Sequence, residues 1–81
     1  MVHDIKILPE YYQPVLDQRK TFEVRKNDRD YQPGDFILLN EFDGTKFTGR
    51  LSRAQILYVS DYQQAEGYVV FSFKLMDSYP Q

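Results

Sequence analysis

The sequence predicts a mainly β fold with one N-terminal helix, arranged as a small closed or nearly closed β-barrel. Three observations predict it. Apolar and polar residues alternate in several short segments, a helical repeat occurs once near the N-terminus, and turn-forming Pro, Gly, Asn and Asp separate the segments. With 81 residues, the chain is expected to form a single domain, residues 1–81.

The first two elements are expected to be a strand and a helix joined at Pro9. Apolar and charged residues alternate over His3–Leu8, which predicts a strand. Apolar residues recur at helical spacing over Glu10–Gln18, which predicts a helix. Pro14 lies inside that helix and lacks an N–H group, so we expect a kink or two short turns.

The run Lys20–Lys26 alternates at period two and predicts a second strand. We expect Phe22 and Val24 to point to the core. Lys20 stands at the start of this strand, where its flexible side chain can reach the polar face. That face carries a hydroxyl, a carboxylate and a guanidinium, on Thr21, Glu23 and Arg25.

The central part of the chain reads as a hairpin preceded by a tight turn. Gln32–Asp35 contains Pro and Gly at the positions that a type II turn prefers. The uninterrupted apolar run Phe36–Leu39 predicts a covered strand. Asp43 and Gly44 form a good hairpin turn, and Gly49 predicts a bulge or a sharp bend in the returning strand.

Two further strands complete the expected barrel. Arg53–Ser60 is predicted to be a strand, with Ala54, Ile56 and Tyr58 on one face and Gln55, Leu57 and Val59 on the other, and Asp61–Gly67 is a polar loop. Tyr68–Leu75 alternates with apolar residues on its inner face. We expect residues 76–81 to form a frayed tail.

Composition limits the chemistry that is available. The chain has no Cys, one His and a net charge of −2. We therefore expect no metal site, no cofactor and no catalytic triad built on His3, which we expect to be a partly exposed strand residue. The sequence has no apolar run of transmembrane length and no disulfide framework, so we expect a cytoplasmic protein.

The polar row on the second strand has two interpretations. Lys20, Glu23 and Arg25 can orient an anionic or polar ligand, or they can satisfy one another as an ordinary ion-pair cluster. The segment from Arg19 to Arg29 carries five basic side chains against two acidic ones, on an otherwise acidic chain. Such a local patch fits one anionic group or a few nucleotides, and it equally fits a solvated, charge-mixed loop.

Several segments carry a resemblance to known families. Gln18–Arg25 resembles the ASCH signature Gly-x-Lys-x-x-Glu-x-Arg, with Gln18 in place of Gly. Over about His3 to Phe73, the chain looks like the DUF3850 family, a small ASCH-related family of bacterial and phage proteins. The segments that carry this second resemblance are Ile7–Tyr12, Lys20–Asp30, Thr48–Arg50 and Tyr68–Val70.

This resemblance implies a PUA-like β-barrel with a ligand cleft, a fold associated with RNA binding. We therefore expect an RNA-binding module, or one that binds a modified nucleoside or nucleotide. Positive and hydrogen-bonding side chains would contact phosphate or base edges, and Tyr side chains, including Tyr31 and Tyr62, could stack on a base. The expected ligand-binding residues are Lys20, Thr21, Glu23, Arg25, Lys26, Arg29, Arg50 and Tyr68.

Two alternatives remain open at this point. Some small ASCH-like proteins are amidohydrolases that act on acylated nucleosides, and here Lys20 and Glu23 would be the catalytic candidates. Those enzymes use a Thr nucleophile three residues after the motif Lys, where this chain has Glu23. The other alternative is a protein–protein interaction module with exposed aromatics at Phe42, Phe47 and Tyr62. The sequence does not determine the oligomeric state.

Overall fold

The computed structural model describes residues 1–80, and within them it contains one helix and five strands. No helix in that range has the length and apolar character needed to span a membrane. In chain order the elements are β1 (Val2–Ile7), α1 (Pro9–Leu16), β2 (Phe22–Lys26), β3 (Phe36–Phe42), β4 (Phe47–Ser60) and β5 (Tyr68–Tyr79).

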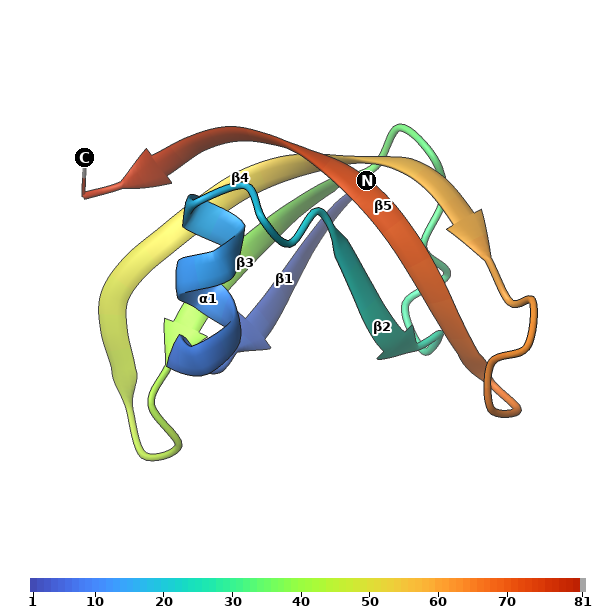
Figure 1. The fold of residues 1–81 in the computed structure, drawn as a ribbon, viewed down its shortest axis with the longest axis horizontal. Helices are drawn as coiled ribbons and strands as arrows, with labels where there is room; N and C mark the ends of the chain where they lie inside the picture. Colours follow the sequence, from blue (N-terminus) through green and yellow to red (C-terminus); the bar gives the residue numbers. More distant parts are fainter. Residues whose placement is uncertain (81) are drawn as a thin grey trace.

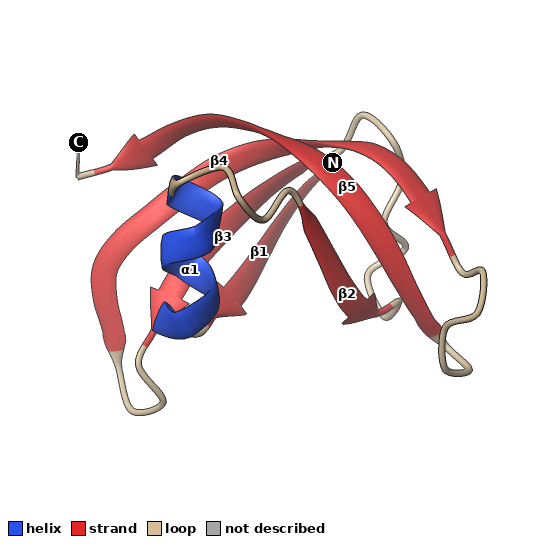
Figure 2. Cartoon of the chain, in the orientation of Figure 1, coloured by secondary structure: helices blue, strands red, loops and turns tan. Residues whose placement is uncertain are grey.

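The five strands form one mixed sheet in the order β1-β3-β4-β5-β2. β1 runs parallel to β3, and the other neighbouring strands are antiparallel. The sheet bends into a half-barrel, with α1 inside the arch (Figures 1 and 2). The mainly β prediction with one N-terminal helix is confirmed. The expectation of a closed or nearly closed barrel is corrected to a half-barrel, because β1 and β2 do not pair with each other.

Two arginines, Arg25 of β2 and Arg29 in the loop that follows it, bond to the edge strand β1 across the open side. Arg25 Nη2 donates to the backbone carbonyl of Lys6 at 2.6 Å, and Arg29 Nη1 donates to the carbonyl of Asp4. Both carbonyls lie on the free edge of β1, where no strand pairs with them. Because an open strand edge carries unpaired backbone groups, these side chains satisfy part of the edge.

Helix α1 ends two residues earlier than predicted, at Leu16. The amide of Gln18 donates to the carbonyl of Val15 at 3.0 Å, and the amide of Arg19 donates to that of Pro14 at 2.9 Å. Gln18 has a φ of 58°. This is the left-handed ending that usually carries Gly. Gln18 therefore places a side chain in a backbone conformation that favours Gly.

The core fills the concave side of the sheet beneath α1. His3 is 4% exposed, and its Nε2 donates to Asp35 at 2.7 Å, while its ring packs edge-on to Tyr31. The expectation of a partly exposed His3 is therefore wrong: the carboxylate of Asp35 provides the partner that lets the imidazole be buried. The hydrogen bond from His3 in turn lowers the pKa of Asp35. The buried apolar residues are Ile5, Ile7, Tyr12, Val15, Tyr31, Ile37, Leu39, Ala54, Ile56, Val69, Phe71 and Phe73.

Strand β5 continues to Tyr79, so the prediction of a frayed tail from residue 76 is wrong for residues 76–79. Its last residues pair with β4, where Ser78 stands opposite Ser52 and Asp77 opposite Arg53. The Ser52 and Ser78 hydroxyls are 2.8 Å apart, and Arg53 Nη2 donates to Asp77 at 2.9 Å. These polar cross-strand contacts hold the end of β5 in the sheet, although its residues do not show the apolar alternation from which a strand is predicted. Gln81 lies outside the described residues.

The bulge predicted at Gly49 is confirmed. The register between β3 and β4 shifts between Asn40 and Phe42, so that residues 48–50 lie opposite the single residue Glu41. Gly49 has a φ of 93°, a conformation that favours Gly. Strands β4 and β5 show two further irregularities, between Arg53 and Ala54 and between Ile56 and Tyr58, and Tyr58 is exposed.

The strain at the end of α1 gives a stability prediction. We expect Gln18→Gly to stabilise the fold by about 0.5–1 kcal/mol, because Gly adopts positive φ without the Cβ clash. Urea unfolding at pH 7 measures the change. Gln18→Ala is the matched control, since it keeps the Cβ and should bring no gain. A Gly variant no more stable than the Ala variant would contradict the assignment of strain to this residue.

Candidate functional site

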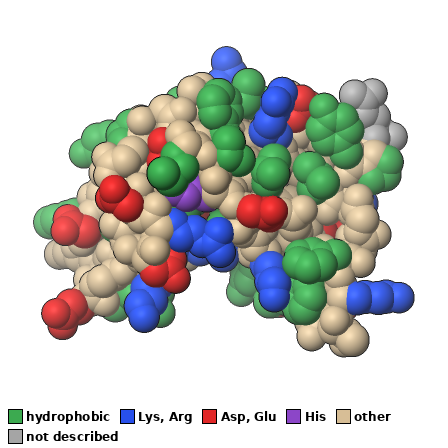
Figure 3. Space-filling view, turned by 180° about the vertical axis from the view of Figure 1, so that it is seen from behind, with side chains coloured by type: hydrophobic (Ala, Val, Ile, Leu, Met, Phe, Trp, Pro, Cys, Tyr) green, Lys and Arg blue, Asp and Glu red, His purple; other side chains and the backbone are tan. Residues whose placement is uncertain are grey.

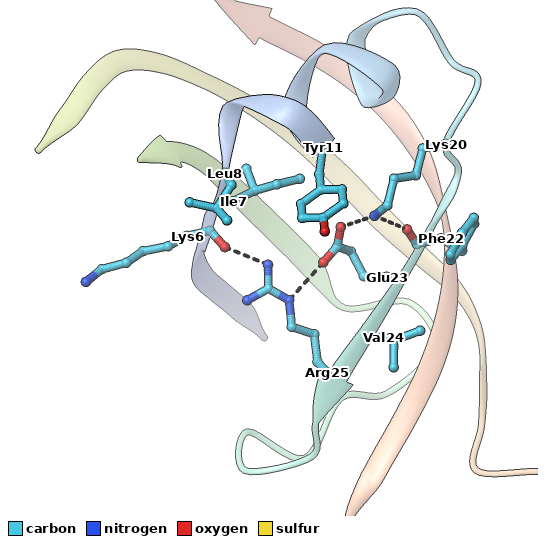
Figure 4. Close-up of a pocket in the computed structure, with 9 residues that line it drawn as sticks. All are labelled: Lys6, Ile7, Leu8, Tyr11, Lys20, Phe22, Glu23, Val24 and Arg25. Carbon is cyan, nitrogen blue, oxygen red and sulfur yellow. Dashed lines mark hydrogen bonds and ion pairs between the residues drawn. The ribbon is translucent and has the colours of Figure 1, made fainter. Parts of the chain in front are cut away.

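A pocket of about 450 Å³ lies between the end of β1, the start of α1 and strand β2 (Figure 4). Three residues expected from the sequence to form the site, Lys20, Glu23 and Arg25, meet in it. The first wall consists of Lys6, Ile7, Leu8 and Tyr11, and the second of Lys20, Phe22, Glu23, Val24 and Arg25.

Glu23 is the buried centre of the polar group, at 5% exposed. Its Oε1 accepts a hydrogen bond from Lys20 Nζ, and its Oε2 accepts one from Arg25 Nε at 2.8 Å. Lys20 Nζ also donates to the carbonyl of Phe22 at 2.7 Å. A buried carboxylate is tolerated only when it is paired, and here two cations hold it. The group therefore carries a net charge of +1 at the pocket wall.

The predicted orientation of strand β2 is wrong. Phe22 and Val24, expected to face the core, are 47% and 48% exposed, whereas Glu23 is buried beside its cross-strand partner Phe71. The charged face of β2 thus points inward. Alternation identifies two faces of a strand but not which one is covered, and an ion-paired acid can occupy the covered face at an edge strand.

Arg25 is held at two points and keeps one nitrogen free. Nε donates to Glu23, Nη2 donates to the carbonyl of Lys6, and Nη1 has no hydrogen-bond partner within residues 1–80. Figure 4 shows the guanidinium lying between these two partners, while the Lys6 side chain extends away from the pocket. Arg25 therefore positions the wall and still offers a donor.

The pocket also has aromatic walls that the sequence analysis missed. Tyr11 is 49% exposed and Phe22 47% exposed, both without a place in the core. Lys20 Nζ lies 5.9 Å from the centre of the Tyr11 ring and 5.0 Å from that of Phe22. Tyr11 falls outside the apolar stripe of α1. An aromatic residue in that position at the helix start was the feature of the sequence that could have indicated a pocket residue.

The remaining expected residues lie elsewhere. Thr21 and Lys26 are exposed and do not line the pocket, and Arg29 contacts β1 beyond it. Tyr68 borders a separate hollow of about 290 Å³ formed with the loop before β5. Tyr31, considered as a stacking residue, is buried in the core. No group of three or more His, Cys, Asp or Glu side chains among residues 1–80 could hold a metal ion.

Arg50 belongs to a second ion pair, apart from the pocket. Its Nε and Nη2 each donate to the buried Glu41 at 2.8 Å, and its guanidinium lies 5.0 Å from the Tyr12 ring centre. The hydrogen bonds from Arg50 lower the pKa of Glu41, and Thr48 adds a further one at 2.6 Å. Burial raises the pKa of Tyr12, whose hydroxyl is 2.9 Å from Ser52. This cluster joins β3, β4 and α1.

The surface has no separate basic face on the side seen in Figure 3, where acidic and basic side chains are interspersed. This mixture agrees with the net charge of −2. On this face, therefore, no extended basic surface is available to attract a polyanion.

The profile of the family described as "Domain of unknown function (DUF3850)" matches residues 2–73 of this chain. The chain belongs to this family. The match spans every element from β1 to the middle of β5, so all nine pocket-lining residues of this chain lie inside it.

A relative of this DUF3850 protein is known from Escherichia phage P2. It is described as an uncharacterized 12.9 kDa protein in the GpA 3'region, and it is 40% identical over 60 residues. The alignment covers 74% of this chain and 55% of the relative. The chain thus spans little more than half the length of the curated relative that it matches. The resemblance to a family with phage members is confirmed.

The Glu41–Arg50 pair gives a prediction for pH dependence. A carboxyl with a lowered pKa in the folded state stabilises the fold above its unfolded pKa, and that stability is lost as pH falls through the folded pKa. We expect Glu41→Gln to cost about 2 kcal/mol at pH 7. The difference between the variant and the parent protein should shrink as the pH falls below about 4.5. Urea unfolding at several pH values measures this; a difference that is constant with pH would contradict it.

Proposed function

We propose that this protein binds single-stranded RNA, or a nucleoside-like ligand, by holding one base in the pocket against Tyr11 and Phe22. Lys20 and Arg25 supply positive charge and donors, and Glu23 fixes both cations in place. In this proposal the half-barrel is a small PUA-like fold of the ASCH type, and the pocket is its ligand cleft.

One observation carries the proposal: two half-exposed aromatic rings border the same pocket as a cationic, hydrogen-bonded group. Aromatic side chains without a role in the core offer stacking surfaces for bases. The pocket volume of about 450 Å³ falls in the range typical of small-ligand sites. The paired carboxylate keeps the cations ordered before a ligand arrives, which lowers the entropy cost of binding.

The amidohydrolase alternative lacks such support. Its nucleophile would be a hydroxyl near Lys20, yet none of the nine lining residues, all within the described range, is Ser or Thr. Thr21 instead faces solvent, and its carbonyl accepts from Phe73 in the β2–β5 ladder. The interaction-module alternative rests on exposure alone: Phe47 is 54% and Tyr62 75% exposed, while Phe42 and Phe47 pack on each other with ring centres 5.1 Å apart. Exposed aromatics by themselves do not identify a partner.

A stacking test separates the pocket from the rest of the surface. We expect Tyr11→Ala to weaken binding of short single-stranded RNA by about 10- to 100-fold, the usual range for one base–aromatic contact. Fluorescence anisotropy with labelled heptamers of each base measures the dissociation constant. Tyr11 is half exposed, so its removal should leave the unfolding free energy nearly unchanged.

Tyr58→Ala is the matched control, because Tyr58 is an exposed Tyr on β4 that does not line the pocket. It should bind as the parent protein does. Equal losses in both variants would mean that RNA binds to the surface in general. The absence of any RNA or nucleoside binding by the parent protein would refute the proposed function.

Salt dependence tests how many cations contact the ligand. A site with two or three phosphate contacts should give a slope of about −1.5 to −2 when the logarithm of the association constant is plotted against that of the salt concentration. The association constant of the same heptamers is measured between about 50 and 300 mM salt, a range over which such slopes can be resolved. A slope near zero would show that phosphate is not contacted.

A further inference from the structure

Val24 is the pocket-lining residue of β2 whose backbone N–H and C=O both lack a partner within residues 1–80. In an antiparallel pair, alternate residues direct both their N–H and C=O groups to the partner strand, and the residues between them direct both groups away. Thr21 accepts a backbone hydrogen bond from Phe73, and Asn27 donates one to Gly67, both across to the β5 side. Val24 lies three residues from each, so its N–H and C=O point away from β5.

The neighbouring residue confirms this orientation. The carbonyl of Phe22, two residues before Val24, accepts from Lys20 Nζ at 2.7 Å on the pocket side. β2 is the last strand of the sheet order, so no strand covers its second edge. Val24 itself lines the pocket. No side chain within residues 1–80 bonds to its N–H or its C=O.

We infer that the backbone of Val24 is the base-reading element of the pocket. Its adjacent N–H and C=O form a donor–acceptor pair that matches the Watson–Crick edge of an unpaired base, where a donor stands beside an acceptor. This inference rests on the proposed function and adds the ligand feature that is recognised. Because a base in a duplex uses that edge for pairing, the pocket selects single-stranded RNA or a free nucleoside.

The occupant is a base and not an extended peptide. Strand addition needs a run of free backbone groups along an edge. Here Lys20 already occupies the Phe22 carbonyl. On the opposite edge, Arg25 and Arg29 occupy the carbonyls of Lys6 and Asp4. Among the pocket-lining residues of β2, only Val24 has both backbone groups unpaired within residues 1–80, and the aromatic rings of Tyr11 and Phe22, which suit a flat heterocycle, line the same pocket.

The first test follows the Val24 amide directly. In the parent protein, Val24 N–H should exchange rapidly with solvent, and saturating single-stranded RNA heptamer should slow its exchange by about tenfold or more. The Lys26 amide is the matched control, because it lies on the same free edge outside the pocket. Protection of Val24 alone supports the inference. RNA binding without protection of Val24 overturns it.

The second test removes one hydrogen-bond donor at a time, first the Val24 N–H of the protein and then the N3–H of the uracil base. Val24→Pro deletes an N–H that the sheet does not use, and Pro is tolerated at such edge positions. We expect about a tenfold loss of affinity for an oligouridine heptamer, against less than threefold for Val24→Ala, which keeps the N–H. In the parent protein, N3-methyluridine in place of uridine should cause a similar loss, and in Val24→Pro little further loss.

The outcomes separate this inference from the proposed function. If the parent protein binds RNA with sensitivity to Tyr11→Ala, but Val24→Pro and N3-methylation change nothing, the base-reading role is overturned and the proposed function stands. If no RNA or nucleoside binds, both fail. If Val24→Pro does not fold, the methylated heptamer and the amide exchange still decide. Protection of Val24 by an extended peptide in the absence of RNA binding would also overturn the inference.

Discussion

The burial of one carboxylate, Glu23, organises the open side of this fold. A buried acid is stable only when cations and donors compensate for its lost hydration. Lys20 approaches it from the turn after α1, and Arg25 approaches it along β2. Arg25 then extends to the carbonyl of Lys6, so the same ion-pair group connects β2 to β1. The pocket wall and the connection across the half-barrel are therefore one structure.

This arrangement explains why a half-barrel can hold its two edges close without a hydrogen-bond ladder. Backbone pairing between β1 and β2 would close the sheet and remove the pocket. Side-chain donors from Arg25 and Arg29 satisfy β1 carbonyls instead, and they leave space beside β2. The Lys20 segment had two interpretations, a ligand site and a self-satisfied ion-pair cluster, and the two are compatible. The cluster is satisfied, and it borders a pocket in which one Arg25 nitrogen and the backbone groups of Val24 have no partner within residues 1–80.

The second buried acid, Glu41, is also compensated by a cation, but here the ion pair joins strands and does not border the pocket. Arg50 pairs with it through two hydrogen bonds, and the cluster extends to Thr48 and to the Tyr12 ring. It lies where the Gly49 bulge leaves Glu41 opposite three residues of β4. Arg50, expected from the sequence to contact a ligand, instead compensates for a buried charge between two strands.

The sequence by itself determined the strand-rich class, the single N-terminal helix, the Gly49 bulge and the family, because these depend on local spacing and on matched residues. It also identified Lys20, Glu23 and Arg25 as a group. Only the tertiary structure decided which face of β2 is buried, that β5 continues to Tyr79, and that Tyr11 and Val24 join the pocket. The physical reason is common to all three. Which face of a strand is covered, which Ser and Asp side chains pair across strands, and which strand edge lies exposed are all set by elements distant in the chain, and period-two alternation carries no record of those elements.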